Sequence, residues 1–145
     1  MTSYRDLPGK IARGELPPPP VAQLIGFRLV ASELGKAIFE LPANEKHANP
    51  MGTLHGGILC DVADAAMGMA FASTLADGET FTTLELKINF LKPVWNAKLT
   101  AVGTVVRRGK TIGLTQCDIT DEEGQLVARA SSTVMTLRGE RARGR

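Results

Sequence analysis

The sequence predicts an α+β fold in which an antiparallel sheet wraps around one long buried helix. The chain has a single long helix candidate, residues 57–75, which is apolar on nearly every face and should therefore be buried all round. Segments in which apolar and polar residues alternate, as in strands, lie before and after it. Short turns such as 108–110 join antiparallel neighbours, so a purely parallel sheet is excluded.

Each element before the central helix follows from a local pattern. In chain order we expect a largely polar arm or loose helix at 1–16, an extended proline spacer at 17–20, one helical turn at 21–25 and strands at 27–33 and 36–41. A polar loop then covers 43–54. Its Asn49-Pro50 pair keeps the loop extended there, because a proline disfavours helical backbone at the residue before it.

After the helix the pattern is strand after strand. Strands are expected at 84–90, 98–106, 111–120 and 126–137. The first shows apolar residues at every second position. The helix itself carries small residues that would let another backbone approach closely: Ala63, Ala65, Ala66, Gly68, Ala70 and Ala72.

The length of 145 residues fits one domain. We expect an N-terminal arm with its proline-rich spacer at 1–20, the folded domain at 21–137 and a basic flexible tail at 138–145. Seventeen basic against fifteen acidic residues give a net charge of +2, which is too balanced to predict nucleic-acid binding.

The sequence also allows a prediction of the cellular location and of the state of the cysteines. The start of the chain lacks the apolar stretch of a signal peptide, and two aspartates interrupt the longest apolar run, so no membrane span and a cytoplasmic location are expected. Cys60 and Cys117 give no disulfide framework, and we expect both to be buried free thiols.

The segment from Asn49 to Gly57, which runs into the helix, carries the chemistry. Gly56 and Gly57 fall where a helix begins, and its first N–H groups have no partner inside the helix. Together with the helix dipole, they can hold a carbonyl oxygen that gains negative charge. Asp64 lies two turns further on and is expected to be buried, which is costly unless the carboxylate is paired or has a function. The combination suggests acyl-transfer chemistry.

The spacing of these groups has a consequence for assembly. Eight helical residues rise roughly 12 Å, so the Gly56 amide and the Asp64 carboxylate of one chain cannot both touch one reacting carbon. Two such helices packed antiparallel about a two-fold axis would set Gly56 of one chain opposite Asp64 of the other. If the helix is catalytic, the protein should therefore be at least a dimer.

Structural alternatives stand beside these functional interpretations. Asp64 could be a carboxylate paired to a backbone N–H or a lysine, and Asp61 could simply complement the helix dipole. His55 could be a loop hydrogen-bonder, Asn49 could organise the turn before Pro50, and Thr83 suits a strand without any function. The histidines and aspartates of this region do not form a zinc-ligand spacing.

The motif Asn49-Pro-Met-Gly-Thr-Leu-His55-Gly56-Gly57, with Asp64 nine residues after the histidine, resembles the hot-dog-fold acyl-CoA thioesterases of the phenylacetic-acid-degradation (PaaI) type. The likeness continues through 82–93 and 109–111 and covers roughly residues 20 to 137. Some relatives have a glutamate in place of Asp64, and a neutral residue is common in place of Asp61.

The resemblance implies a specific activity and assembly. It implies a homodimer with continuous sheets, often paired further into a tetramer, that hydrolyses acyl-CoA without a metal or a separate cofactor, since CoA is part of the substrate. Asp64 would be the nucleophile or the general base, and the Gly56 N–H would bind the thioester oxygen. Asn49 and His55 would help to place that oxygen and the loop, and Thr83 occupies a position where a relative has a serine that helps to orient water.

The sequence leaves other functions possible. A hot-dog hydratase or dehydratase and a non-catalytic acyl-CoA-binding module are the alternatives to a thioesterase. The basic residues Arg107, Arg108 and Lys110 could meet the phosphates of CoA or could be solvated turn residues. The acyl group, the choice between dimer and tetramer, and the role of Asp64 as nucleophile or base are not fixed by the sequence.

Overall fold

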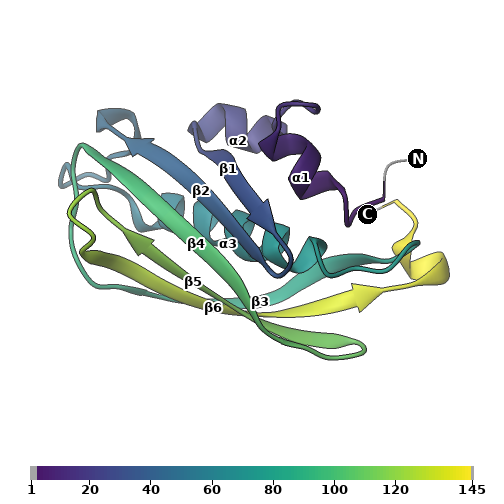
Figure 1. The fold of residues 1–145 in the computed structure, drawn as a ribbon. Coiled ribbons are helices and arrows are strands. Elements are labelled where there is room, and N and C mark those ends of the chain that lie inside the picture. The colour runs from purple at the N-terminus through teal and green to yellow at the C-terminus, as the bar shows by residue number, and fades with distance from the viewer. Residues whose placement is uncertain (1–2, 145) are drawn as a thin grey trace.

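The computed structural model describes residues 3–144, and its centre is a six-stranded sheet with one long helix against it. The strands are β1 (Arg28–Glu33), β2 (Lys36–Ala43), β3 (Thr80–Phe90), β4 (Ala97–Arg108), β5 (Ile112–Thr120) and β6 (Leu126–Leu137). They pair antiparallel in the order β1-β2-β4-β5-β6-β3, so β1 and β3 are the edge strands. The helix α3 (Gly56–Ala72) runs behind the sheet in Figure 1. The predicted α+β fold, a hot-dog fold, is confirmed.

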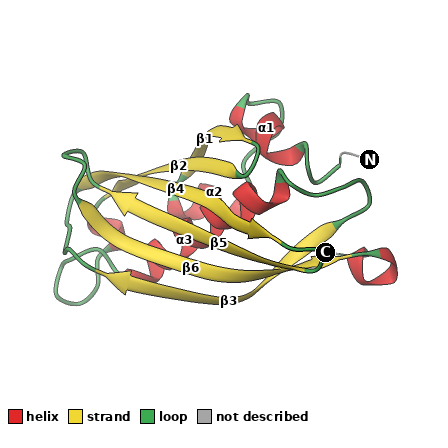
Figure 2. Cartoon of the chain, turned by 60° about the horizontal axis from the view of Figure 1, so that its bottom comes forward, coloured by secondary structure: helices red, strands yellow, loops and turns green. Residues whose placement is uncertain are grey.

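Two short helices precede the sheet (Figure 2), α1 (Leu7–Ala12) and α2 (Pro20–Ile25). Pro20 begins α2 rather than ending an extended spacer, because the fixed φ of proline suits the first helical position. α1 packs against β1 and α3. The arm is therefore docked on the folded domain, and the boundaries at residues 20 and 137 remain predictions.

The helix α3 and the strand β4 approach each other closely in the core. A Cβ atom placed on Gly103 would lie 2.3 Å from the carbonyl oxygen of Ala66 and 2.7 Å from the amide nitrogen of Met67. Backbone therefore lies directly on backbone at this crossing. The small residues of α3 do admit another backbone, as the sequence predicted, and that backbone belongs to a strand of the same chain.

The expectation that α3 is buried all round is wrong for one stripe. Gly57, Asp61 and Asp64 are exposed, whereas Val62, Ala63 and the other core positions of α3 are buried. The exposed stripe borders the edge strand β3, whose Thr83 contacts Asp64. Asp64 is thus not a buried carboxylate in the single chain.

β3 also departs from the expected clean alternation. It begins at Thr80, and its register against β6 shifts between Thr83 and Glu85. The bulge leaves Leu84 exposed, while Leu86 and Ile88 face the core. A bulge re-aims the side chains beside it, and here it falls next to Thr83.

The C-terminal segment expected to be a flexible tail contains a short 3-10 turn, η2 (Gly139–Ala142), and Arg138 pairs with Glu79 at 2.6 Å. Cys117 is buried as expected, and burial, followed by the charge of Asp118, raises its pKa to about 12. Cys60 is only half-buried, because it borders the open stripe of α3.

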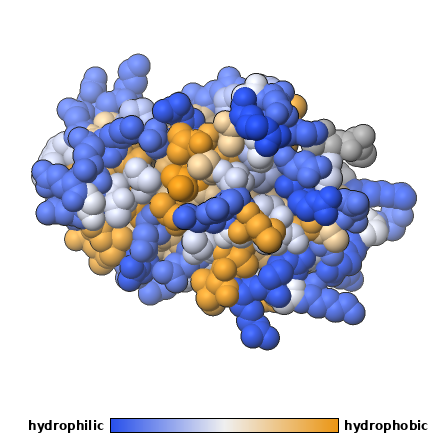
Figure 3. All heavy atoms as spheres, in the orientation of Figure 1, coloured by the Kyte–Doolittle hydropathy of each residue, from blue (hydrophilic) through white to orange (hydrophobic). Residues whose placement is uncertain are grey.

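On the face of the molecule in Figure 3, apolar side chains form separate patches among hydrophilic ones. Scattered patches of this kind are usual on a folded domain. No helix among residues 3–144 is long and apolar enough to cross a membrane. The cytoplasmic location stays a prediction.

Candidate active site

The loop before α3 is organised by Asn49. Its side-chain oxygen accepts hydrogen bonds from the backbone N–H groups of Met51 (2.9 Å) and Thr53 (3.2 Å), and its amide nitrogen donates to Thr53 Oγ1 at 2.7 Å. This is the fold of an Asx turn. Asn49 therefore shapes the loop, which is the structural alternative that the sequence left open.

His55 caps the start of α3. Its Nδ1 accepts a hydrogen bond from the Gly57 N–H at 2.9 Å, so the neutral ring carries its proton on Nε2. The backbone N–H of His55 donates to the carbonyl of His47 at 2.9 Å. Of the two glycine amides expected to be free, the one on Gly57 is thus occupied. Within the described chain the Gly56 N–H has no acceptor.

Asp64 and Thr83 meet across α3 and β3. The Thr83 hydroxyl donates to Asp64 Oδ1 at 2.9 Å. Thr83 is half-buried beside the bulge of β3, and Asp64 is exposed on α3. The structure thus brings together two residues that lie 19 positions apart and that the sequence selected for separate reasons.

Gly56 and Asp64 do not meet within the chain. α3 is one unbroken helix from Gly56 to Ala72, so eight residues separate them by roughly 12 Å. The single chain therefore holds an amide donor at one position of the helix and a carboxylate with its hydroxyl partner at another.

A second carboxylate accompanies Asp64 on the open stripe. Partial burial, and then the charge of Asp64, raises the pKa of Asp61 above its ordinary value. Burial, and then the charge of Asp61, likewise raises the pKa of the Cys60 thiol. Two carboxylates, Asp61 and Asp64, therefore lie close together on the open stripe.

The basic residues of the β4–β5 hairpin do not form one free cluster. Arg108 pairs with Glu79 at 3.0 Å, donates to Thr74 Oγ1 at 3.2 Å and lies 4.8 Å above the ring of Phe71. The guanidinium of Arg108 is held in place by the nearly buried carboxylate of Glu79. Arg108 is thus already paired within the chain, and its binding of CoA phosphates stays a prediction, whereas Arg107 and Lys110 are exposed.

Glu79 is the residue that sequence analysis missed here. Burial opposes its ionisation, but hydrogen bonds from the Ala76 N–H and Arg138, with the charges of Arg138 and Arg108, outweigh burial and lower its pKa. Its position before β3 gives no sequence signal of this role, because its partners lie 29 and 59 residues away.

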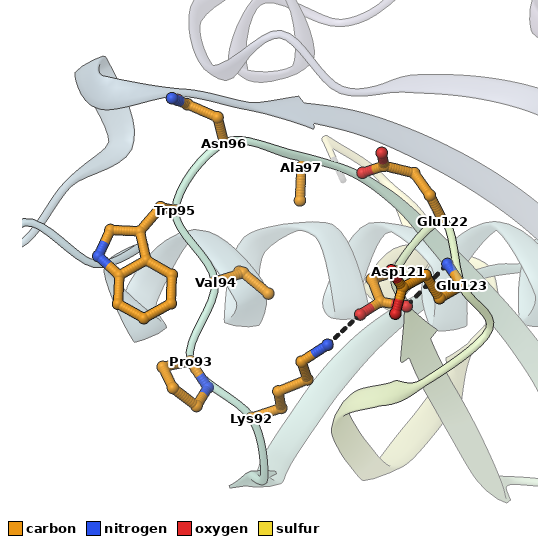
Figure 4. A pocket seen from close by; sticks show the side chains of 9 residues that line it. All are labelled: Lys92, Pro93, Val94, Trp95, Asn96, Ala97, Asp121, Glu122 and Glu123. Carbon is orange, nitrogen blue, oxygen red and sulfur yellow. Dashed lines mark hydrogen bonds and ion pairs between the residues drawn. The ribbon is translucent and has the colours of Figure 1, made fainter.

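Two of the hollows on the surface lie away from Gly56, Asp64 and Thr83. The one in Figure 4, of about 290 Å³, lies between the 92–97 loop and the acidic turn 121–123. Lys92 reaches Asp121 across it, while the Trp95 ring points away from that turn. A larger hollow of about 1240 Å³ lies between the N-terminal arm, the start of β3 and η2. Neither is lined by Gly56, Asp64 or Thr83. Among residues 3–144 no group of three or more His, Cys, Asp or Glu side chains could hold a metal ion.

Comparison with known proteins gives one consistent result. The sequence model of the thioesterase superfamily matches residues 51–128. A putative esterase of Saccharolobus solfataricus is 34% identical over 118 residues, which are 81% of this chain and 84% of the relative. Human acyl-coenzyme A thioesterase 13 is 31% identical over 72% of this chain and 76% of its own.

Solved structures agree with the fold. A putative thioesterase of Ralstonia eutropha JMP134, described as related to phenylacetic acid degradation, superposes with a TM-score of 0.80 at 29% identity, covering 92% of this chain and 99% of its own. The PaaI protein of E. coli superposes with a TM-score of 0.82 over 96% of this chain and 98% of its own, at 23% identity.

Proposed function

Since the chain belongs to the thioesterase superfamily and is a thioester hydrolase, we propose that it cleaves acyl-CoA to a free acid and CoA at sites shared between two subunits. The observation that carries the proposal is the layout of α3. The Gly56 amide, which has no acceptor among residues 3–144, and Asp64, which accepts a hydrogen bond from Thr83 of β3, lie on one helix roughly 12 Å apart. Each supplies half of what thioester hydrolysis needs.

The chemistry follows from the roles of the two halves. The Gly56 N–H of one subunit holds the thioester oxygen as it gains negative charge. Asp64 of the other subunit takes a proton from water while the water oxygen bonds to the carbonyl carbon. Collapse of the tetrahedral intermediate breaks the C–S bond, and the CoA thiolate leaves and takes up the proton that Asp64 accepted from water. Thr83 holds the Asp64 carboxylate in place through its 2.9 Å hydrogen bond. Direct attack by Asp64, with a mixed anhydride hydrolysed afterwards, is the second form of the same proposal.

A homodimer places the halves together. β3 is an edge strand with unpaired backbone groups, and the exposed apolar side chains Leu84, Phe90 and Leu91 lie on it or just after it. The open stripe of α3 lies behind this edge. Pairing of two β3 edges about a two-fold axis would continue the sheet, cover the stripe and bring Gly56 of each chain to Asp64 of the other. A further pairing of dimers into a tetramer belongs to the same proposal.

The remaining predicted residues take supporting roles. Asn49 and His55 hold the loop that presents the Gly56 amide. Arg107 and Lys110, which are exposed, would meet phosphates of CoA. The reaction needs no separate cofactor, because CoA is part of the substrate.

Thiol release from a panel of saturated acyl-CoAs tests the function. We expect release of free CoA, and Asp64→Asn should lower kcat by about a hundred- to ten-thousand-fold. A hydratase would leave saturated acyl-CoA intact, and a non-catalytic module would bind it without turnover. Either result with the wild-type protein would contradict the proposal.

The phosphate contacts have their own test. Arg107→Ala/Lys110→Ala should raise KM for acyl-CoA and leave KM unchanged for an acyl thioester of N-acetylcysteamine, which has no phosphates. An equal KM for acyl-CoA in the wild type and the double variant would remove these two residues from the site.

A further inference from the structure

The ring of Phe90 occupies the space beside Gly56 where a side chain would be. A Cβ atom on Gly56 would lie 2.7 Å from Cζ of Phe90, and 3.0 and 3.1 Å from its Cε atoms. Gly56 is not among the glycines with positive φ, so its backbone conformation does not require glycine. The residue at position 56 lacks a side chain because the ring tip fills that place.

The backbone that carries the ring is held by the sheet. Phe90 is the last residue of β3 and lies opposite Ala128 of β6, and the next N–H, that of Leu91, donates to the Val127 carbonyl at 2.9 Å. A second ring of β3 repeats the arrangement, since a Cβ on Gly68 would lie 3.3 Å from Phe81. Two rings of one edge strand thus rest on two glycines of α3 and set the spacing between strand and helix.

Of these two contacts, only that of Phe90 involves the residue whose N–H is proposed to bind the thioester oxygen, Gly56. Phe90 remains 56% exposed, so much of the residue faces solvent. An amide that polarises a carbonyl must be aimed closely, and a misplacement of about 1 Å can cost on the order of a hundredfold in rate.

We propose that Phe90 is the positioning residue of the oxyanion site: its ring tip fixes the Gly56 amide against the end of β3. The inference rests on the proposed function for its kinetic part. Phe90 and Gly56 belong to the same chain, so the contact itself does not depend on the dimer.

A double-variant cycle tests the proposal. Phe90→Ala should lower kcat roughly 10- to 100-fold with little change in KM, because the contact acts on the amide and not on ground-state binding. Phe90→Met, which is nearly as long, should retain more activity than Phe90→Ala. Gly56→Ala should also lower kcat, and Gly56→Ala/Phe90→Ala should be no slower than the slower single variant.

The chain offers two matched controls. Leu91 follows Phe90, is 55% exposed and lies at the same proposed dimer edge, so Leu91→Ala should spare far more of kcat than Phe90→Ala if loss of apolar surface at that edge is not the cause. Gly68→Ala meets the other ring at a looser 3.3 Å and lies away from the amide, so it should also spare kcat. An unchanged kcat in Phe90→Ala, or losses that multiply in the double variant, would overturn the proposal.

Thermal unfolding separates this inference from the proposed function. Gly56→Ala should lower Tm in the wild-type background and lower it less in the Phe90→Ala background, because the clash is then absent. Equal losses in both backgrounds would refute the contact. A wild-type protein without thioesterase activity would refute the proposed function while leaving this cycle as the test of the contact.

Discussion

Removal of the Thr83 hydroxyl tests whether this side chain acts through Asp64. Thr83 Oγ1 donates to Asp64 Oδ1 at 2.9 Å, and Thr83→Val keeps the shape of the side chain but deletes the donor. Hydrogen bonds to charged groups contribute about 1.5–3 kcal/mol, and we take the lower end because Asp64 is exposed. That value corresponds to a roughly tenfold loss of kcat.

The assay is thiol release by Thr83→Val, Asp64→Asn and the double variant. Asp64→Asn alone should cost about a hundred- to ten-thousand-fold. If Thr83 works only by holding the carboxylate, adding Thr83→Val to Asp64→Asn should cost nothing more. Thr82→Val is the matched control, because Thr82 precedes Thr83 on β3 and faces the other side of the sheet.

Two results would refute this reasoning. A tenfold loss that persists in the Asp64→Asn background would mean that Thr83 contacts water or substrate directly. A loss in Thr82→Val equal to that in Thr83→Val would mean that both changes merely disturb the strand.

Three further changes test the energetics by thermal unfolding. Asp61→Asn should raise Tm slightly at pH 7, since like charges at i, i+3 cost about 0.2–0.5 kcal/mol. Because the folded-state pKa of Asp61 is raised, this gain should vanish below about pH 3.8, and an equal gain at every pH would contradict it. Glu79→Gln should cost about 2 kcal/mol, roughly 6 °C in Tm, at pH 7. Since the folded-state pKa of Glu79 is lowered, the difference should shrink as the pH falls below 4.5, and a pH-independent difference would count against the ion pairs. Gly103→Ala should cost about 3 kcal/mol or prevent folding, because its Cβ would meet the backbone of Ala66; an unchanged Tm would disprove that close approach.

The fold could be predicted from the sequence because it depends on periodic and local patterns of apolar and polar residues. One long apolar segment among alternating segments leaves few arrangements, and small residues such as Ala66 indicated a close backbone contact that the structure places at Gly103. The exposed stripe of α3 was not predicted. Apolar content alone does not tell which side of a helix is covered, since that depends on β3 being an edge strand.

The candidate site could be predicted from the sequence only in part. The spacing of Gly56 and Asp64 is a property of one helix, and the sequence therefore predicted their separation. The contact of Phe90 with Gly56 joins residues 34 positions apart, and it depends on the register of β3 after its bulge. The capture of Arg108 by Glu79 is likewise a contact between distant segments, so the hairpin looked freer in sequence than it is.

Mixing two inactive variants tests the shared site most directly. Asp64→Asn lacks the carboxylate. Gly56→Pro lacks the amide donor; the backbone of a first helical position suits proline, although the proline ring must displace the tip of the Phe90 side chain. Each should be nearly inactive alone, and thermal unfolding should show that each is folded. In a mixed dimer one site keeps both groups, so random exchange of subunits should restore about a quarter of wild-type activity. No recovery after verified subunit exchange would contradict the shared site, as would full activity of a lone protomer.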